Sequence, residues 1–237
     1  MAKNLLLTFL KGILAGLAIG LGGFIFVLMS FLIPGELGKA LGSVLFAVGL
    51  FLVCTFSLSL YTGKIGLIFE KKQSAEFYIG LPIMLIGNAI GAFGLGYLAY
   101  FAFKDLSIME TAVKVANARL SFNSFDDYLS CILKSFLCGT CVYLAVKCFN
   151  LNRLKPVGIF LLVFFVFLFV YCGFQHCIAN MFYFGFANKV YGETFIDLAL
   201  CILFNSFGPI IGVMLFKLVE KAKDNSKPIK DDTPKEK

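Results

Sequence analysis

The residue best suited to chemistry in this chain is its single histidine, His176. Gly173, Gln175 and Asn180 lie close to it within an otherwise apolar stretch. Imidazole can donate a hydrogen bond to an anion and can exchange a proton near neutral pH. The alternative is a histidine held neutral by a neighbouring carbonyl in helix packing. Because an ionisable group deep in an apolar segment is functional by default, we expect a role in function.

A second polar interruption occurs where residues 57 to 64 read Ser-Leu-Ser-Leu-Tyr-Thr-Gly-Lys after a run of bulky apolar residues. Non-helical backbone at bilayer depth is tolerated only when it is buried in protein or lines a polar cavity. Interrupted segments that recur three spans apart are typical of transport sites at the interface of two repeats. The two interruptions therefore predict one transport site.

The cysteines and charges inside apolar segments have simpler interpretations. Cys138 and Cys141 have no second pair and no histidine beside them, and membrane-buried thiols behave as small hydrophobes. We therefore expect no disulfide, no metal site and no cofactor. Lys134 is expected to snorkel or to pair with Asp127 or Asp197 at one membrane surface. The chain has eight cysteines, at positions 54, 131, 138, 141, 148, 172, 177 and 201.

The elements that must position these residues are membrane spans. The chain has 237 residues, of which 59% are hydrophobic and 15% charged, with a mean hydropathy of +0.89. Such a composition leaves too few polar groups for a water-facing surface, and the apolar runs do not alternate as β-barrel strands would. We expect six transmembrane helices. Their ranges are about 9–33, 39–63, 77–103, 128–149, 156–187 and 195–221.

Basic residues are unequally divided between the two sides of these spans. Fifteen of the 21 Lys and Arg residues fall on the side of both termini and six on the other. The positive-inside rule then places both termini in the cytoplasm. We expect the chain to lie in the cell inner (plasma) membrane, in contact with lipid. Residues 1–221 would form a channel domain and residues 222–237 a disordered cytoplasmic tail. The formal charge of +7 is no indication of nucleic-acid binding.

Glycines at four-residue spacing, such as Gly12 and Gly16, predict closely packed helices. A faint internal echo links residues 87–91, Gly-Asn-Ala-Ile-Gly, with residues 208–212, Gly-Pro-Ile-Ile-Gly. The echo lies three spans apart in segments of opposite orientation. It therefore predicts an inverted repeat.

Several segments in the right order resemble the formate/nitrite transporter family, whose members carry small monovalent anions such as formate, nitrite and hydrosulfide. Residues 173–182, Gly-Phe-Gln-His-Cys-Ile-Ala-Asn-Met-Phe, are similar to the family's fifth-helix signature, and residues 60–62, Leu-Tyr-Thr, to its second-helix loop. Residues 46–50, 87–91 and 144–146 give supporting matches. The resemblance implies an all-α, aquaporin-like inverted repeat of six transmembrane helices with broken second and fifth helices, assembled as a homopentamer.

The resemblance also implies roles for particular residues. His176 would lie between two hydrophobic constrictions, with Thr62 as its hydrogen-bonding neighbour and Asn180 satisfying freed backbone groups. Arg119, or else Lys114, would be the cation of the outer vestibule. The cytoplasmic constriction would comprise Phe46, Leu50 and Phe169, and the outer one Leu60, Tyr61 and Val142.

The chain departs from the family at two positions. Gly208-Pro209 replaces a Gly-Asn pair of the sixth helix, so Asn205 is a candidate for the missing polar partner, and Gln175 stands where some members have Glu. The function expected is transport of a small weak-acid anion with protons through His176. An aquaporin-like channel for neutral small solutes is the alternative, although the string Asn-Pro-Ala occurs nowhere. No arrangement typical of an enzyme is present in the spans.

Overall fold

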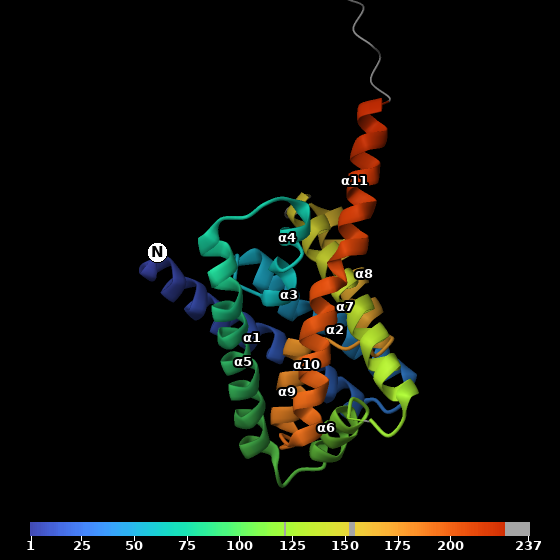
Figure 1. Ribbon diagram of the computed structural model, residues 1–237. Helices are drawn as coiled ribbons and strands as arrows, with labels where there is room; N and C mark the ends of the chain where they lie inside the picture. Colours follow the sequence, from blue (N-terminus) through green and yellow to red (C-terminus); the bar gives the residue numbers. More distant parts are fainter. Residues whose placement is uncertain (121, 152–154, 226–237) are drawn as a thin grey trace, which may run out of the picture.

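The computed structural model describes residues 1–120, 122–151 and 155–225. These residues form eleven helices and no strand (Figure 1). The helices are α1 Ala2–Leu32, α2 Glu36–Thr55, α3 Tyr61–Lys64, α4 Leu67–Glu70, α5 Ala75–Phe103, α6 Ile108–Asn117, α7 Phe125–Leu151, α8 Pro156–Tyr171, α9 Cys177–Phe186, α10 Gly192–Phe207 and α11 Pro209–Asn225. Because α11 continues to Asn225, it enters the segment expected to be a tail, and residues 226–237 lie outside those described.

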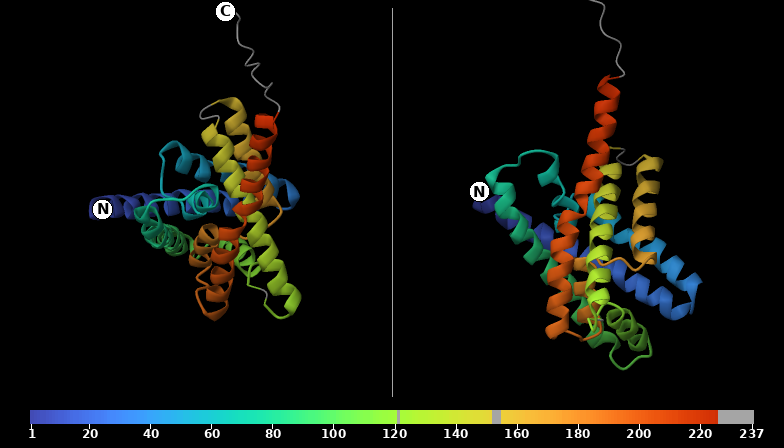
Figure 2. Two further views of the ribbon diagram at one scale, coloured as in Figure 1. Left: turned by 45° about the horizontal axis from the view of Figure 1, so that its top comes forward. Right: turned by 45° about the vertical axis from the view of Figure 1, so that its right-hand side comes forward.

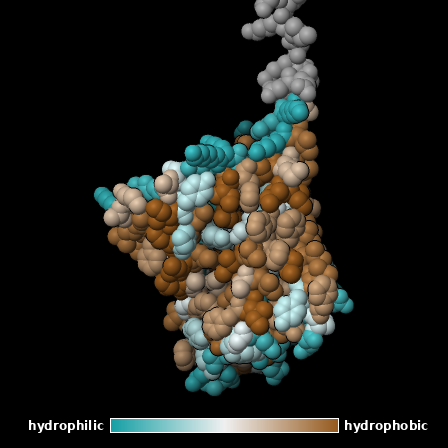
Figure 3. All heavy atoms as spheres, viewed as in Figure 1, coloured by the Kyte–Doolittle hydropathy of each residue, from teal (hydrophilic) through white to brown (hydrophobic). Residues whose placement is uncertain are grey.

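The helices are those of a multi-pass membrane protein. Within the described residues, five helical stretches are long and apolar enough to cross a bilayer: α1, α2, α5, α7 and the pair α10–α11. The visible face of the molecule is mostly hydrophobic, with hydrophilic residues gathered at its two ends (Figure 3). Outward-facing side chains such as Leu98 and Phe160 are more than 60% exposed, which only lipid or another apolar surface would solvate well.

The molecule has two distinct ends. The N-terminus of α1, the short helix α4 and the end of α11 lie toward one end, which we call the terminal side (Figures 1 and 2). Helix α6 lies at the opposite end, which we call the far side. Helix α2 therefore starts toward the far side, because it follows α1 across the molecule.

Helical structure stops within two of the expected spans. Helix α2 ends at Thr55 and helical structure resumes at Tyr61, while α8 ends at Tyr171 and α9 begins at Cys177. Each stop includes a residue in the left-handed region, Ser57 with φ of 51° and Gly173 with φ of 68°. Left-handed backbone cannot continue an α-helix, so the chain turns at both points.

An asparagine from a neighbouring helix holds the first of these turns. Asn88 of α5 accepts a hydrogen bond from the backbone N–H of Tyr61 (2.8 Å) and donates to the carbonyls of Ser59 (2.8 Å) and Gly12 (2.8 Å). Its side chain is fully buried. The amide thus satisfies backbone groups that the interrupted helix leaves without intrahelical partners.

A second asparagine makes matching contacts at the other turn. Asn205 of α10 accepts from the N–H of Cys177 (2.9 Å) and donates to the carbonyls of Gln175 (2.8 Å) and Ser135 (2.7 Å). Residues 59 and 61 of the first turn therefore correspond to residues 175 and 177 of the second. The residue between the bonded groups is Leu60 in one turn and His176 in the other.

Glycines bring the helices that carry these amides into backbone contact. A Cβ added at Gly16 would lie 2.2 Å from a backbone oxygen of the partner helix, and one added at Gly139 would lie 2.3 Å from such an oxygen. The corresponding distances are 2.1 Å for Gly91 and 2.2 Å for Gly208. The contacts pair Gly91 with Gly208, whereas the sequence echo paired Gly87 with Gly208. The proposed alignment of the echo was therefore wrong by four residues, because small residues recur at that spacing.

Candidate functional site

His176 lies at the start of α9, deep inside the molecule. Its Nδ1 accepts a hydrogen bond from the N–H of Ala179 (3.1 Å) and so caps the helix, and its Nε2 lies 2.9 Å from Oγ1 of Thr62. Because Nδ1 is an acceptor, the neutral ring carries its proton on Nε2 and donates it to Thr62. His176 is only 2% exposed and Thr62 only 1%. The two interrupted segments thus meet at this hydrogen bond.

Two phenylalanines lie beside the histidine ring. The ring of Phe169 stacks on His176 with centroids 5.7 Å apart, and Phe46 packs edge-on against Phe169 at 5.8 Å. These three residues line a cavity of only about 10 Å³, which has room for about one water-sized probe. Arg119 and Asn180 line the same small cavity. The ring of His176 therefore borders a cavity with room for about one water molecule.

The structure places the residues expected at the two constrictions on the opposite sides from those expected. Phe46 and Phe169 share their cavity with Arg119, which follows α6 on the far side, whereas they were expected on the side of the termini. Leu60 instead lines a cavity with Lys64 and Lys147 on the terminal side. The expectation was wrong because α2 begins toward the far side, which places Phe46 nearer that end than the turn after Thr55.

A cavity on the terminal side has a volume of about 240 Å³. Leu60 and Val146 line it, and Val146 was missed as a site residue although its segment had been matched. Tyr61 belongs instead to a separate apolar cluster with Ile65 and donates to or accepts from Ser206 at 2.8 Å. The remaining predicted constriction residues, Leu50 and Val142, are buried in the main core.

Arg119 places a positive charge beside the small cavity on the far side. Its Nε donates to Oδ1 of Asn180 (3.0 Å), its guanidinium lies 4.3 Å from the centroid of the Tyr183 ring, and it also donates to the carbonyl of Val115. The alternative vestibule residue, Lys114, is exposed. A second cavity of about 70 Å³ continues from Arg119 outward and is lined also by Lys134.

Asn180 has a different role from the one expected. Its amide nitrogen donates to Oε1 of Gln175 (2.8 Å) and to Oδ2 of Asp197 (2.9 Å), so its oxygen faces Arg119. It bonds side chains and not freed backbone groups. Asp197 is fully buried and accepts a hydrogen bond from Asn180. Among the described residues, it forms no ion pair with Lys134, which was one of the expected pairings. No spacing in the sequence indicated this contact, because Arg119, Asn180 and Asp197 come from separate elements.

Asn205 occupies the place suggested for a missing polar partner. Its amide bonds the backbone on both sides of His176, at residues 175 and 177. Position 205 lies one helical turn before Gly208-Pro209, so it presents its side chain on the same face of the helix. Pro209 begins α11, where a missing N–H costs no intrahelical bond.

The fold and this site define a class: a multi-pass helical membrane protein with a buried polar centre between two cavities. The family model described as formate/nitrite transporter matches residues 1–221, and the chain belongs to this family. Its members are channels and transporters and not enzymes.

Relatives and solved structures agree with this membership. The chain is 31% identical over 185 residues to the uncharacterized transporter YrhG of Bacillus subtilis (strain 168), covering 72% of this chain and 67% of that one. A solved pentameric formate channel with formate bound has a similar fold, with a TM-score of 0.74, 23% identity, and coverage of 95% of this chain and 99% of that chain. An FNT family ion channel is similar with a TM-score of 0.72, 21% identity, and coverage of 96% and 92%.

Proposed function

We propose that this protein is a channel for small monovalent anions of weak acids, such as formate, nitrite or hydrosulfide, and that transport is linked to protons through His176. The observation that carries the proposal is the buried hydrogen bond between His176 and Thr62, which joins the two interrupted segments beside Phe169. Membership in the formate/nitrite transporter family and the fold shared with a formate channel support it.

The apolar residues on each side of His176 explain why a proton is needed. Phe46 and Phe169 lie toward the far side and Leu60 toward the terminal side, and all three are at most 3% exposed. Moving a bare ion into a low-dielectric medium costs of order 20 kcal/mol in the ideal case. A neutral acid loses only polar-group solvation, roughly a few kcal/mol. A weak acid that takes up a proton near His176 therefore crosses far more easily than its anion.

The contacts of the histidine ring define how it takes part. The Nε2–H that now donates to Thr62 can donate to an anion placed beside it. A proton can reside on Nδ1 only while Ala179 loses its hydrogen-bond acceptor, because imidazolium has donors alone. The charged ring passes its Nε2 proton to the anion, which leaves the other proton on Nδ1. The helix cap is recovered only when Nδ1 loses that proton and Nε2 is protonated again.

Arg119 prepares this step from the far side. Its guanidinium lines both the outer cavity and the small cavity at His176, so it attracts the anion toward the ring. Gln175 and Asp197 fix the amide of Asn180, whose oxygen orients Arg119. In this proposal Asn180 is a positioning residue for the vestibule cation.

The wider architecture is part of the same proposal. The matching contacts of Asn88 and Asn205 support an inverted repeat in which the second and fifth of six spans are broken. A homopentamer with one pore per protomer is supported by the pentameric state of the similar formate channel. The excess of basic residues supports cytoplasmic termini, hence a cytoplasmic terminal side, in the plasma membrane.

Flux through purified protein in liposomes tests the proposal. We expect uptake of formate, nitrite or hydrosulfide to rise as the external pH falls, and His176→Asn to abolish most of that dependence. Asn117→Ala, at an exposed residue of α6, is the matched control. Glycerol-driven swelling of the same liposomes tests the alternative of a neutral-solute channel. Unchanged pH-dependent uptake by His176→Asn would show that the ring has no such role.

A further inference from the structure

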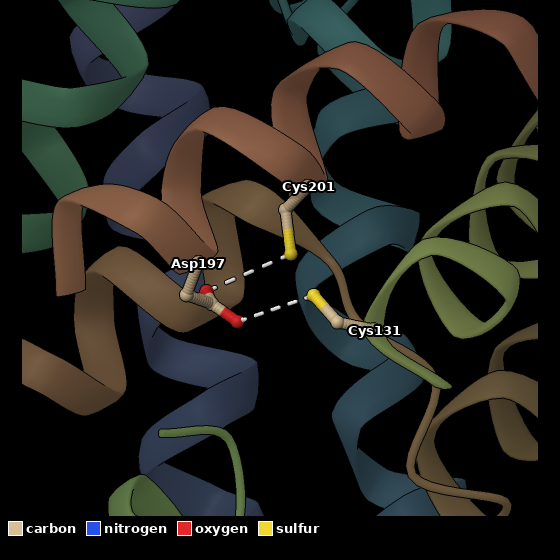
Figure 4. Close-up of side chains that lie close together, drawn as sticks. All are labelled: Cys131, Asp197 and Cys201. Carbon is tan, nitrogen blue, oxygen red and sulfur yellow. Dashed lines mark hydrogen bonds between the residues drawn. The ribbon is translucent and has the colours of Figure 1, made fainter. Parts of the chain in front are cut away.

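Two cysteines and an aspartate form a compact cluster between α7 and α10, beside the polar centre but separate from His176. Asp197 and Cys201 are four residues apart on one face of α10, and Cys131 faces them from α7 (Figure 4). Their three donor atoms lie within 4.8 Å of one another and all three residues are buried. The sequence did not predict this cluster, because the cysteines of the apolar segments were interpreted as small hydrophobic side chains.

We propose that Cys131, Asp197 and Cys201 form a binding site for a thiophilic divalent cation of the Zn²⁺ or Cd²⁺ kind. The sulfur of Cys201 lies 3.6 Å from Oδ2 of Asp197 and the sulfur of Cys131 lies 3.8 Å from Oδ1. In a tetrahedral zinc site with bonds of about 2.3 Å to sulfur and 2.0 Å to oxygen, the donors are about 3.5 Å apart. These two distances end on different carboxylate oxygens, and the three donor atoms lie within 4.8 Å of one another, so the side chains need to draw together by about 1 Å.

The hydroxyl of Ser135 lies near the position of a fourth ligand. Oγ of Ser135 lies 3.3 Å from the sulfur of Cys201 and 4.0 Å from that of Cys131. It is one helical turn from Cys131 on the same face of α7. A water that completes the tetrahedron can hydrogen-bond to this hydroxyl, so the cation keeps four ligands without a third cysteine.

Charge balance favours the exchange of protons for the cation. In the step, two S–H bonds break, two sulfur–metal bonds and one oxygen–metal bond form, and two protons leave toward solvent without any electron transfer. The carboxylate with two thiols carries a charge of −1, and the carboxylate with two thiolates and a divalent cation also carries −1. Arg119, which is linked to Asp197 through Asn180, offsets that charge in both states. No net charge is added to the interior.

The cation has a route to the cluster from the far side. Cys131 lines the cavity of about 70 Å³ that also contains Asp127 and Ser130. Arg119 and Lys134 line the same cavity and repel cations. We therefore expect binding to be slow in onset and to be tight once the two sulfurs are engaged.

Occupation of this site would act on the transport centre. Oδ2 of Asp197 now accepts a hydrogen bond from Asn180, and a metal ion bound to Oδ2 takes the place of that donor. The amide of Asn180 then loses one of the two acceptors that turn its oxygen toward Arg119. This consequence rests on the proposed function, and it predicts that the bound cation slows anion flux.

Titration with Cd²⁺ tests the site directly. The reduced protein, in a Cys172→Ser background that removes the exposed thiol, should develop an ultraviolet thiolate-to-cadmium band that saturates at one ion per protomer. Cys131→Ser and Cys201→Ser should each abolish the band, and Asp197→Asn should weaken binding at least about tenfold. Cys138→Ser, at another buried cysteine of α7, should bind Cd²⁺ like the parent. An unchanged band in Cys131→Ser or Cys201→Ser, or no band in the parent, overturns the proposal.

Two further measurements keep the result decisive. Cadmium NMR of the parent protein should show a signal with the shift of a two-sulfur site, and a shift typical of oxygen ligands alone overturns the proposal even if a variant fails to fold. In liposomes, Cd²⁺ added on the far side should slow formate uptake severalfold in the parent and in Cys138→Ser, but not in Cys201→Ser. A cadmium band in protein that does not conduct formate would reject the proposed function and leave the metal site standing.

Discussion

The hydrogen bonds of the Asn205 amide allow a prediction of how much stability they contribute to the turn at His176. Asn205→Leu keeps the volume of the side chain but removes its hydrogen bonds to the N–H of Cys177 and the carbonyls of Gln175 and Ser135. Because Ser135 lies inside α7, where its carbonyl accepts an intrahelical bond, the groups at Cys177 and Gln175 are the two left without a partner. A buried backbone group left without its partner costs about 1–3 kcal/mol, so the pair costs about 2–6 kcal/mol. At about 2–4 °C per kcal/mol for a chain of this size, the melting temperature should fall by on the order of 10 °C.

Thermal unfolding in detergent, followed by loss of the folded peak in size-exclusion chromatography, measures this shift. Asn88→Leu should cause a loss of similar size, because Asn88 makes the matching bonds to residues 59 and 61. Asn117→Ala replaces an exposed asparagine and should melt within about 2 °C of the parent protein, since such substitutions cost at most about 0.5 kcal/mol. If Asn205→Leu melts as this control does, the amide does not hold the turn and the reasoning fails.

Three further predictions follow from the packing and the far-side contacts. Gly208→Ala forces a Cβ to within 2.2 Å of a backbone oxygen and should lower the melting temperature by several degrees, whereas Gly94→Ala, with open space around it, should not. Arg119→Lys loses the Nε bond to Asn180 and the ring contact, so formate uptake should fall severalfold at one pH. Phe169→Ala removes the ring stacked on the histidine, and proteoliposomes should then leak anions at a pH where the parent is nearly closed.

The sequence predicted where the helices are interrupted, because polar residues inside an apolar run have a physical cost. Gly, Gln, His and Asn inside an apolar run are costly at bilayer depth, so their presence at residues 173–180 indicates interrupted backbone. The structure stops helix α8 at Tyr171 and resumes it at Cys177. The contact of Thr62 with His176, expected from the resemblance, is present at 2.9 Å.

The sequence could not predict which side chains from distant segments meet. Asp197 lies 17 positions from Asn180 and 66 from Cys131, and only the packing of α7, α9 and α10 brings the three together. The sides of the two constrictions were predictable in principle. A chain whose first span starts on the terminal side begins its second span on the far side, and this order places Phe46 before Leu60.

The matching turns at Leu60 and His176 have a consequence for engineering. At each turn, an asparagine amide from a neighbouring helix bonds the backbone on both sides of one residue, Leu60 or His176. These bonds involve backbone groups only, so they do not depend on the side chain of that residue. In this chain an aliphatic residue, Leu60, occupies the first turn and a titratable ring, His176, occupies the second. The residue at each turn can therefore be changed independently of the amide bonds: Leu60→His would place a second imidazole at the first turn, with Asn88 and Asn205 left unchanged.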